Sequence, residues 1–104
     1  MPYYVYITTN STHSVLYVGM TGELLYRVKQ HREKRLGGFT RRYNATRLVY
    51  YEEFDSAYDA ITREKQLKAG TRRKKMQLVD ELNPKWRDLY EQLAGEDEGA
   101  LRPP

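Results

Sequence analysis

Two short segments rich in aromatic and β-branched residues lie close together near the N-terminus, and they constrain the fold more than any other feature. Residues 3–9 and 15–19 both have the composition of β-strands. The polar stretch between them, residues 10–13, is typical of a turn. The pattern predicts an antiparallel hairpin. Residues two apart on a strand, such as Tyr4 and Tyr6, then point to the same face.

The chain after the hairpin alternates between helical and extended patterns. A helix is predicted over residues 22–35, where apolar residues recur at intervals of three and four. Gly37 and Gly38 are expected to end this helix. Residues 38–46 are polar and basic and are predicted to form a loop. Residues 47–54 have the pattern of a third strand.

Two further helices are indicated by their capping residues. Ser56 is the expected N-cap of the first, which ends at Gly70, and Thr71 is the expected N-cap of the second. The second helix is predicted to end at Asn83, because the next residue is a proline and disfavours helix in the residue before it.

A short amphipathic segment over residues 86–93 completes the predicted domain, which covers residues 1–93. Residues 94–104 are rich in glycine, acidic residues and proline, and we predict an acidic, disordered tail there. Three short strands cannot enclose a core alone. The predicted fold is therefore an α/β domain with a small three-stranded, partly antiparallel sheet flanked by helices.

The balance of charges limits the class of partner. The formal net charge is +4 and the sequence pI is near 9.3, which favours a polyanion such as nucleic acid. The absence of cysteine excludes disulfides, thiolate zinc sites and a cysteine nucleophile. There is no apolar run long enough to span a membrane and no signal-peptide pattern, so a cytoplasmic protein is expected.

Three polar residues interrupt helical apolar stripes and are candidates for chemistry. Glu64 lies on the apolar side of its helix, where it is either a Mg²⁺ ligand or the partner of a nearby lysine or arginine. Arg27 and His31 are four residues apart and share a helix face. Arg27 suits a contact to a phosphate, and His31 suits a proton relay. The alternative is an exposed basic pair in which Arg27 forms an ion pair with Glu23.

Basic residues gather in several clusters that interleave with aromatic side chains. Phe39 and Tyr43 could stack on bases. The alternative is a basic surface that serves solubility alone. The candidate nucleic-acid contacts are Arg41, Arg42, Lys68, Arg72, Arg73 and Lys74.

Taken in order along the chain, these residues resemble the GIY-YIG nuclease family. Tyr4-Val5-Tyr6 corresponds to Gly-Ile-Tyr, with tyrosine in place of glycine, and Tyr17-Val18-Gly19 corresponds to Tyr-Ile-Gly. The similarity extends over roughly residues 2–90 and is closest to small stand-alone bacterial members of the family. The matching site residues are Tyr6, Tyr17, Gly19, Arg27, His31, Glu64 and Asn83.

The resemblance implies a divalent-metal-dependent endonuclease-type domain that hydrolyses phosphodiester bonds in nucleic acid, with DNA favoured over RNA. Glu64 would hold Mg²⁺ or Mn²⁺, and Tyr6 would act as general base with help from Tyr17. Arg27 would neutralise charge on the phosphate. His31 would accept the proton of the tyrosine or contact the phosphate.

Two of the implied roles are structural. Gly19 would allow close approach of the backbone, and Asn83 would position site groups. The alternatives are a non-catalytic nucleic-acid-binding module with the same fold and a subunit that a protein partner directs to its substrate.

Overall fold

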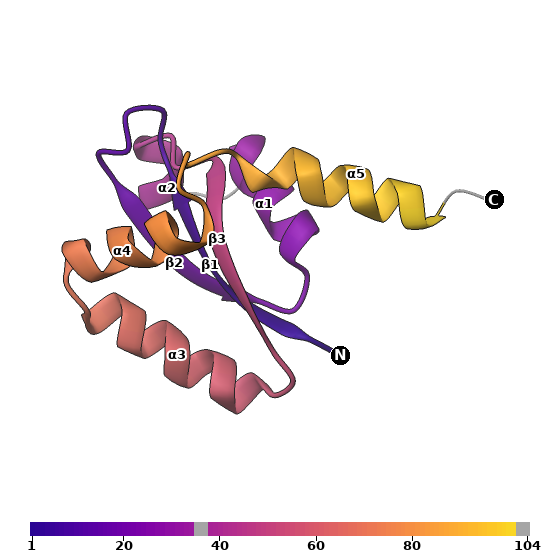
Figure 1. Ribbon diagram of the computed structural model, residues 1–104, viewed down its shortest axis with the longest axis horizontal. Helices are drawn as coiled ribbons and strands as arrows, with labels where there is room; N and C mark the ends of the chain where they lie inside the picture. The colour runs from indigo at the N-terminus through magenta and orange to yellow at the C-terminus, as the bar shows by residue number, and fades with distance from the viewer. Residues whose placement is uncertain (35–37, 102–104) are drawn as a thin grey trace.

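The first strand of the chain is the central strand of the sheet. In this computed structural model, β1 (Tyr3–Thr9) pairs with β2 (Leu16–Thr21) on one side and with β3 (Arg47–Phe54) on the other. Both pairings are antiparallel, so the sheet is antiparallel throughout rather than only in part (Figure 1). The structure describes residues 1–34 and 38–101, with the backbone alone described over 96–101.

The alternation of side chains along β1 gives the sheet two buried faces. Tyr4 and Tyr6 point to one face, and Val5 and Ile7 point to the other. Because helices cover both faces, this strand is apolar at successive positions rather than at every second one. This explains the unbroken run of large apolar and aromatic residues near the N-terminus.

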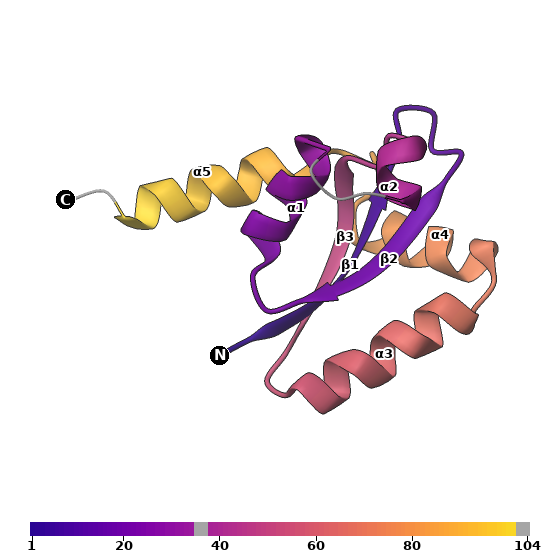
Figure 2. The same ribbon diagram turned by 180° about the vertical axis from the view of Figure 1, so that it is seen from behind.

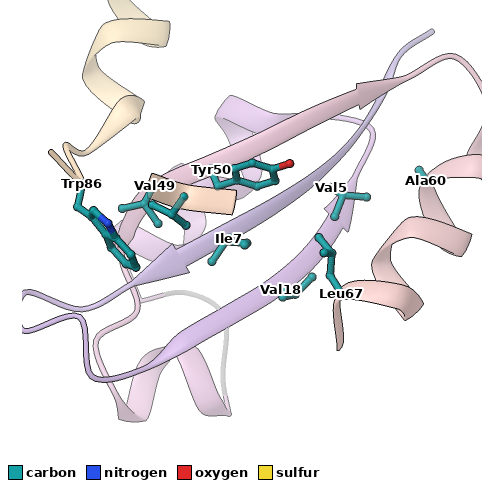
Figure 3. Close-up of a cluster of buried hydrophobic side chains, with 9 residues drawn as sticks. Val5, Ile7, Val18, Val49, Tyr50, Ala60, Leu67 and Trp86 are labelled. Carbon is teal, nitrogen blue, oxygen red and sulfur yellow. The ribbon is translucent and has the colours of Figure 1, made fainter. Parts of the chain in front are cut away.

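The face that carries Val5 and Ile7 packs against α3 (Ala57–Ala69) and α4 (Arg72–Leu82). In Figure 3, Ala60 and Leu67 of α3 lie beside the valines of β1 and β2, and Trp86 lies at the other end of the cluster. The buried residues of this cluster are Val5, Ile7, Val18, Val49, Tyr50, Ala60, Leu67, Val79 and Trp86.

The opposite face packs against α1 (Leu24–Arg32) and α5 (Leu89–Leu101), as the view from behind shows (Figure 2). Tyr6 is buried in this second cluster together with Leu24 and Val28 of α1. The position of α1 across this face therefore determines what surrounds the Tyr6 side chain.

The expected caps are present, but two helix bounds differ from the prediction. Ser56 accepts a hydrogen bond from Asp59 N at 3.1 Å, and Thr71 accepts one from Lys74 N at 3.2 Å. The helix predicted over 22–35 begins later, at Leu24, and ends at Arg32. Of the glycines expected to end it, Gly37 lies outside the described residues.

A short helix, α2 (Phe39–Arg42), forms inside the segment predicted to be a loop. Gly38 precedes it with a φ of 75°, a backbone conformation that other residues rarely adopt. The basic residues at 41 and 42 therefore stand on a turn of helix rather than on an extended loop.

The last helix is longer than the sequence indicates. The amphipathic segment expected to end at residue 93 continues as α5 to Leu101, and the last residues of the expected tail, 102–104, lie outside the described residues. Alanine, leucine and glutamate within this stretch have high helix propensity, which offsets the two glycines. None of the helices in the described part of the chain is long and apolar enough to cross a membrane.

The connection between α4 and α5 covers the outer edge of β3. Asn83 Nδ2 donates a hydrogen bond to Val49 O at 3.2 Å, and Asp88 Oδ1 accepts one from Leu48 N at 3.2 Å. Asp88 also forms an ion pair with Arg32 of α1. This short segment thus links the edge strand to the helix that carries the candidate catalytic residues.

Candidate active site

The Tyr6 hydroxyl lies at the centre of the candidate site. Its side chain is almost fully buried, with 2 % of the residue exposed, and its hydroxyl is 2.9 Å from Nε2 of His31. His31 is equally buried and comes from the last turn of α1. Two residues 25 positions apart in sequence therefore share one buried hydrogen bond.

Gly19 gives the Tyr6 ring the space that it occupies. The two residues are directly opposite each other in the β1–β2 pairing. A Cβ atom added to Gly19 would lie 2.4 Å from both Cζ and the hydroxyl oxygen of Tyr6. The resemblance implied that this glycine lets the backbone approach the site closely, which stays a prediction; in the structure the Tyr6 ring lies against it.

Tyr17 is the next aromatic neighbour of the buried pair. Its ring centroid is 6.4 Å from that of Tyr6 and 5.5 Å from that of His31. It also stacks on Phe39 of α2, with centroids 6.2 Å apart and ring planes at 25°. The second tyrosine therefore connects the buried pair to an exposed aromatic side chain.

The charges of Arg27 and Glu64 both affect the pKa of Tyr6. Burial raises the pKa of Tyr6 above its ordinary value, and nearby Tyr17 raises it further. The Arg27 guanidinium lowers that pKa, whereas the Glu64 carboxylate raises it. One hydroxyl thus feels charges from both α1 and α3.

His31 is held in its neutral form. Burial, reinforced by the positive charge of Arg27, lowers the pKa of His31 from 6.5 to about 4. A neutral imidazole can accept the Tyr6 proton at Nε2, which places its own hydrogen on Nδ1. Within the described residues, His31 Nδ1 and Arg27 Nε are buried without a hydrogen-bond partner.

The buried neutral His31 makes stability depend on pH. Its pKa is lower in the folded chain than in the unfolded chain, so between about pH 6.5 and pH 4 only the unfolded chain binds the proton. Stability therefore falls as the pH drops through this window. We expect the wild type to lose about 2 kcal/mol more than His31→Gln between about pH 7.5 and pH 5.

Urea unfolding at the two pH values measures this difference. His13→Gln is the matched control, because it removes the other histidine and leaves His31 in place. The control should keep the wild-type dependence on pH. Equal pH dependence in the wild type and His31→Gln would contradict the neutral, buried state of His31.

Of the two interpretations of Glu64 that the sequence left open, the structure shows the ion pair, and the metal-ligand role stays a prediction. Its carboxylate is 3.4 Å from Nζ of Lys68, one turn later on α3, so the ion pair exists. The Glu64 side chain is nevertheless 21 % exposed, and the Lys68 side chain is 53 % exposed. Within the described residues, no three His, Cys, Asp or Glu residues cluster as a metal site. A single carboxylate fits Mg²⁺, which keeps several waters and often uses one or two protein carboxylates.

Arg27 lacks the ion pair that was its alternative explanation. In the part of the chain that the structure describes, no salt bridge joins it to Glu23. Its effect on the pKa values of Tyr6 and His31 places its charge beside them instead. The guanidinium is therefore available for an anion next to the buried pair.

Asn83 is buried, but its contacts are structural. Nδ2 donates to Val49 O and to Arg87 O, and Oδ1 accepts from Arg87 N at 3.0 Å. In the described residues no hydrogen bond joins its side chain to Tyr6, Tyr17 or His31. A direct role for Asn83 in chemistry stays a prediction, while its effect on the α4–α5 connection is evident.

The predicted nucleic-acid contacts divide into exposed and engaged side chains. Arg41 and Arg42 are exposed on α2, and Arg42 lies over the ring of Tyr43, 5.5 Å from its centroid. Arg72 instead donates to the carbonyl oxygens of His13 and Ser14 in the β1–β2 turn, at 2.6 and 2.9 Å. The remaining exposed residues of the set are Lys68, Arg73 and Lys74.

The sequence did not reveal that α2 adjoins the site. Phe39 and Tyr43 are four residues apart, and their ring centroids are 4.7 Å from each other. The i, i+4 spacing of these two aromatic residues was the available signal for a helical turn. Together with Tyr17 they form a row of three aromatic rings.

Comparison with known proteins identifies the family of the chain. The family model described as the GIY-YIG catalytic domain matches residues 2–77. The chain belongs to the GIY-YIG family. The match includes all of the candidate site residues except Asn83, which follows it. Members of this superfamily are nuclease-type proteins and generally use divalent metals.

Relatives of this GIY-YIG chain include small proteins of similar length. It is 39 % identical over 79 residues to a UPF0213 protein of Haloquadratum walsbyi, covering 76 % of this chain and 88 % of the relative. It is 38 % identical over 76 residues to a UPF0213 protein of Clostridium perfringens, covering 73 % and 81 %.

A solved structure shares the fold of the GIY-YIG chain. The UPF0213 protein of Bacillus halodurans, determined by solution NMR, superposes with a TM-score of 0.54 at 33 % identity. The superposition covers 85 % of this chain and 93 % of the other. The small α/β fold predicted from the sequence is thereby confirmed.

Proposed function

We propose that this GIY-YIG chain is a divalent-metal-dependent nuclease that hydrolyses phosphodiester bonds in nucleic acid, with DNA preferred to RNA. The observation that carries the proposal is the buried hydrogen bond between Tyr6 and His31, at a point where Arg27 and Glu64 both act. The Arg27 guanidinium and the Glu64 carboxylate shift the pKa of Tyr6 in opposite directions, and perturbed groups of this kind are frequent at functional sites.

The first part of the proposed mechanism is a proton transfer through the buried pair. At rest Tyr6 keeps its proton and donates it to Nε2 of neutral His31. During attack, the Tyr6 oxygen takes a proton from water as its own proton passes to Nε2. Water is thereby converted into the hydroxide that attacks phosphorus, and His31 becomes the imidazolium.

Arg27 makes this transfer dependent on substrate. Its positive charge lowers the pKa of His31, so an imidazolium is disfavoured while the site is empty of anions. A phosphate beside Arg27 would offset that charge and make protonation of His31 easier. The same guanidinium offers a planar fork of donors to the phosphate oxygens. The base would therefore become effective when the substrate is bound.

The metal in this proposal is Mg²⁺ or Mn²⁺, and Glu64 is the residue that would hold it. A bound divalent cation would stabilise the negative charge that develops on the scissile phosphate and the leaving oxygen. Lys68 would leave its ion pair with Glu64 and turn toward a phosphate, which its half-exposed position permits. Tyr17 would orient the attacking water, and Asn83 would position the site through the α4–α5 connection.

The remainder of the substrate would lie along the basic surface. Exposed Arg41 and Arg42 on α2, with Arg73 and Lys74 at the start of α4, suit contacts to phosphates. Phosphate contacts of this kind bind without reading sequence. Arg72 would act indirectly, by holding the β1–β2 turn in place.

Cleavage assays on mixed DNA and RNA substrates test the proposal. We expect cleavage with Mg²⁺ or Mn²⁺, none after EDTA, and at least roughly a tenfold loss in Glu64→Ala. Glu81→Ala is the matched control, since Glu81 is an exposed glutamate on α4. It should cleave like the wild type.

Two results would count against this function. Full activity of Glu64→Ala would remove Glu64 from the metal site. Binding without cleavage, across all substrates and both metals, would instead support a non-catalytic nucleic-acid-binding module.

A further inference from the structure

A groove lies beside the candidate active site and shares none of its proposed residues. It runs between the start of α1, the adjoining ends of β1 and β3, and α5, with a volume of about 630 Å³. Figure 2 shows the start of α1 next to the N-terminal end of β1. Its chemically distinctive lining residues are Tyr4, Glu23, Tyr26, Tyr51, Glu53 and Leu93. We call it the tyrosine groove.

The lining of the tyrosine groove is acidic and aromatic, in contrast to the rest of the chain. No lysine or arginine is among its lining residues, although the chain carries a net charge of +4. Within the described residues, neither Glu23 nor Glu53 forms a salt bridge. Neither carboxylate is thus paired with a basic side chain in this part of the structure.

The tyrosines present ring faces and edges around these carboxylates. Tyr4 donates a hydrogen bond to Glu53 Oε1 at 3.2 Å, and its ring meets Tyr51 edge-on with centroids 6.4 Å apart. Tyr26 of α1 also lines the groove and is 54 % exposed. Tyrosine rings and carboxylates both attract cations.

This chemistry disfavours nucleic acid and favours a cationic side chain. The Glu23 and Glu53 carboxylates repel phosphate groups, so the substrate path of the proposed nuclease would not continue here. We propose that the tyrosine groove binds a basic peptide segment of a partner protein, with an arginine or lysine side chain placed between the tyrosines and the two carboxylates.

The shape of the surface supports a peptide rather than a small cation. A second, smaller hollow adjoins the groove, and the two share Tyr51 and Leu93. Leu82 and Leu89 line this second hollow, and Leu82 is 52 % exposed. A segment that alternates basic and apolar residues would place its cation in the groove and an apolar side chain in the hollow. This proposal does not depend on nuclease activity.

A peptide titration of the full-length ¹⁵N-labelled chain tests it. The probe is an acetylated, amidated peptide of alternating arginine and leucine, and its control replaces each arginine with uncharged citrulline. We expect the arginine peptide to shift the backbone amide signals of Gly22, Leu25 and Glu53, and the citrulline peptide to leave them in place. The double variant Glu23→Gln with Glu53→Gln should weaken binding at least about fivefold.

The matched control removes two carboxylates outside the groove, through Glu81→Gln with Asp59→Asn. It should bind the arginine peptide like the wild type. Equal affinity of both double variants, equal binding of the citrulline peptide, or shifts confined to α2 and α4 would each overturn the proposal. Both double variants should retain wild-type cleavage. The peptide titration tests the groove proposal and the cleavage assay tests the nuclease proposal, so each can fail independently of the other.

Discussion

Gly19→Ala is expected to lower both the stability of the chain and its cleavage activity. The added methyl group would lie 2.4 Å from Cζ and from the hydroxyl oxygen of Tyr6, inside the ring's own volume. The Tyr6 ring would have to move, which breaks its hydrogen bond with His31. Overpacking of this kind typically costs about 1–3 kcal/mol. Urea unfolding and the cleavage assay measure the two effects.

Gly22→Ala is the matched control for this substitution. A Cβ atom at Gly22 would approach only the Tyr3 ring, at 3.9 Å, which is an ordinary contact. We expect this variant to unfold and cleave like the wild type. Wild-type stability and cleavage in Gly19→Ala would show that the Tyr6 ring does not lie against Gly19.

Tyr6→Phe is expected to abolish most cleavage while leaving the fold intact. Phenylalanine keeps the ring that fills the space beside Gly19 and loses only the hydroxyl that bonds to His31. Loss of a general base typically reduces rates by about 10²–10⁴. Loss of the single hydrogen bond should change stability by about 1 kcal/mol. Single-turnover cleavage and circular dichroism distinguish the two effects.

Tyr58→Phe is the control, since Tyr58 is 78 % exposed on α3 and should not affect the rate. Retention of full activity by Tyr6→Phe would assign the base to another group, and Tyr17 would be the first residue to examine. A large loss of stability in Tyr6→Phe would instead show that the hydroxyl is chiefly structural.

The hairpin and its neighbours were predictable because their signals are local. Alternation along residues 3–9 determines which side chains share a face, and antiparallel pairing sets Tyr6 opposite Gly19. The helix caps Ser56 and Thr71 were likewise readable, since each cap bonds to a residue three positions later. These short-range patterns account for the confirmed fold.

The assembly of the site was not predictable from spacing, because it depends on packing between distant elements. Glu64 acts on Tyr6 only because α3 packs close to β1 and β2. Its ion pair with Lys68, by contrast, is local and was one of the two alternatives. The resemblance to a family predicted that Glu64 and Tyr6 belong to one site, which periodicity alone could not predict.

Polar side chains that bond to a remote backbone were the least predictable. Arg72 was predicted to contact nucleic acid, yet its guanidinium bonds to carbonyl oxygens 58 and 59 residues earlier in the chain. Asn83 bonds to Val49, 34 residues away. Such partners depend on the folded arrangement. In the sequence, a basic or amide side chain that binds a ligand therefore looks the same as one that bonds to remote backbone.

The segment that covers the edge of β3 has a consequence for the behaviour of the chain in solution. An uncovered edge strand offers free N–H and C=O groups on which another molecule's strand can pair and start aggregation. Asn83 and Asp88 occupy two of these groups, at Val49 and Leu48, and both lie beyond the residues 2–77 that match the family model. Asn83 and Asp88 therefore occupy part of the β3 edge, where the strand of another molecule would otherwise pair.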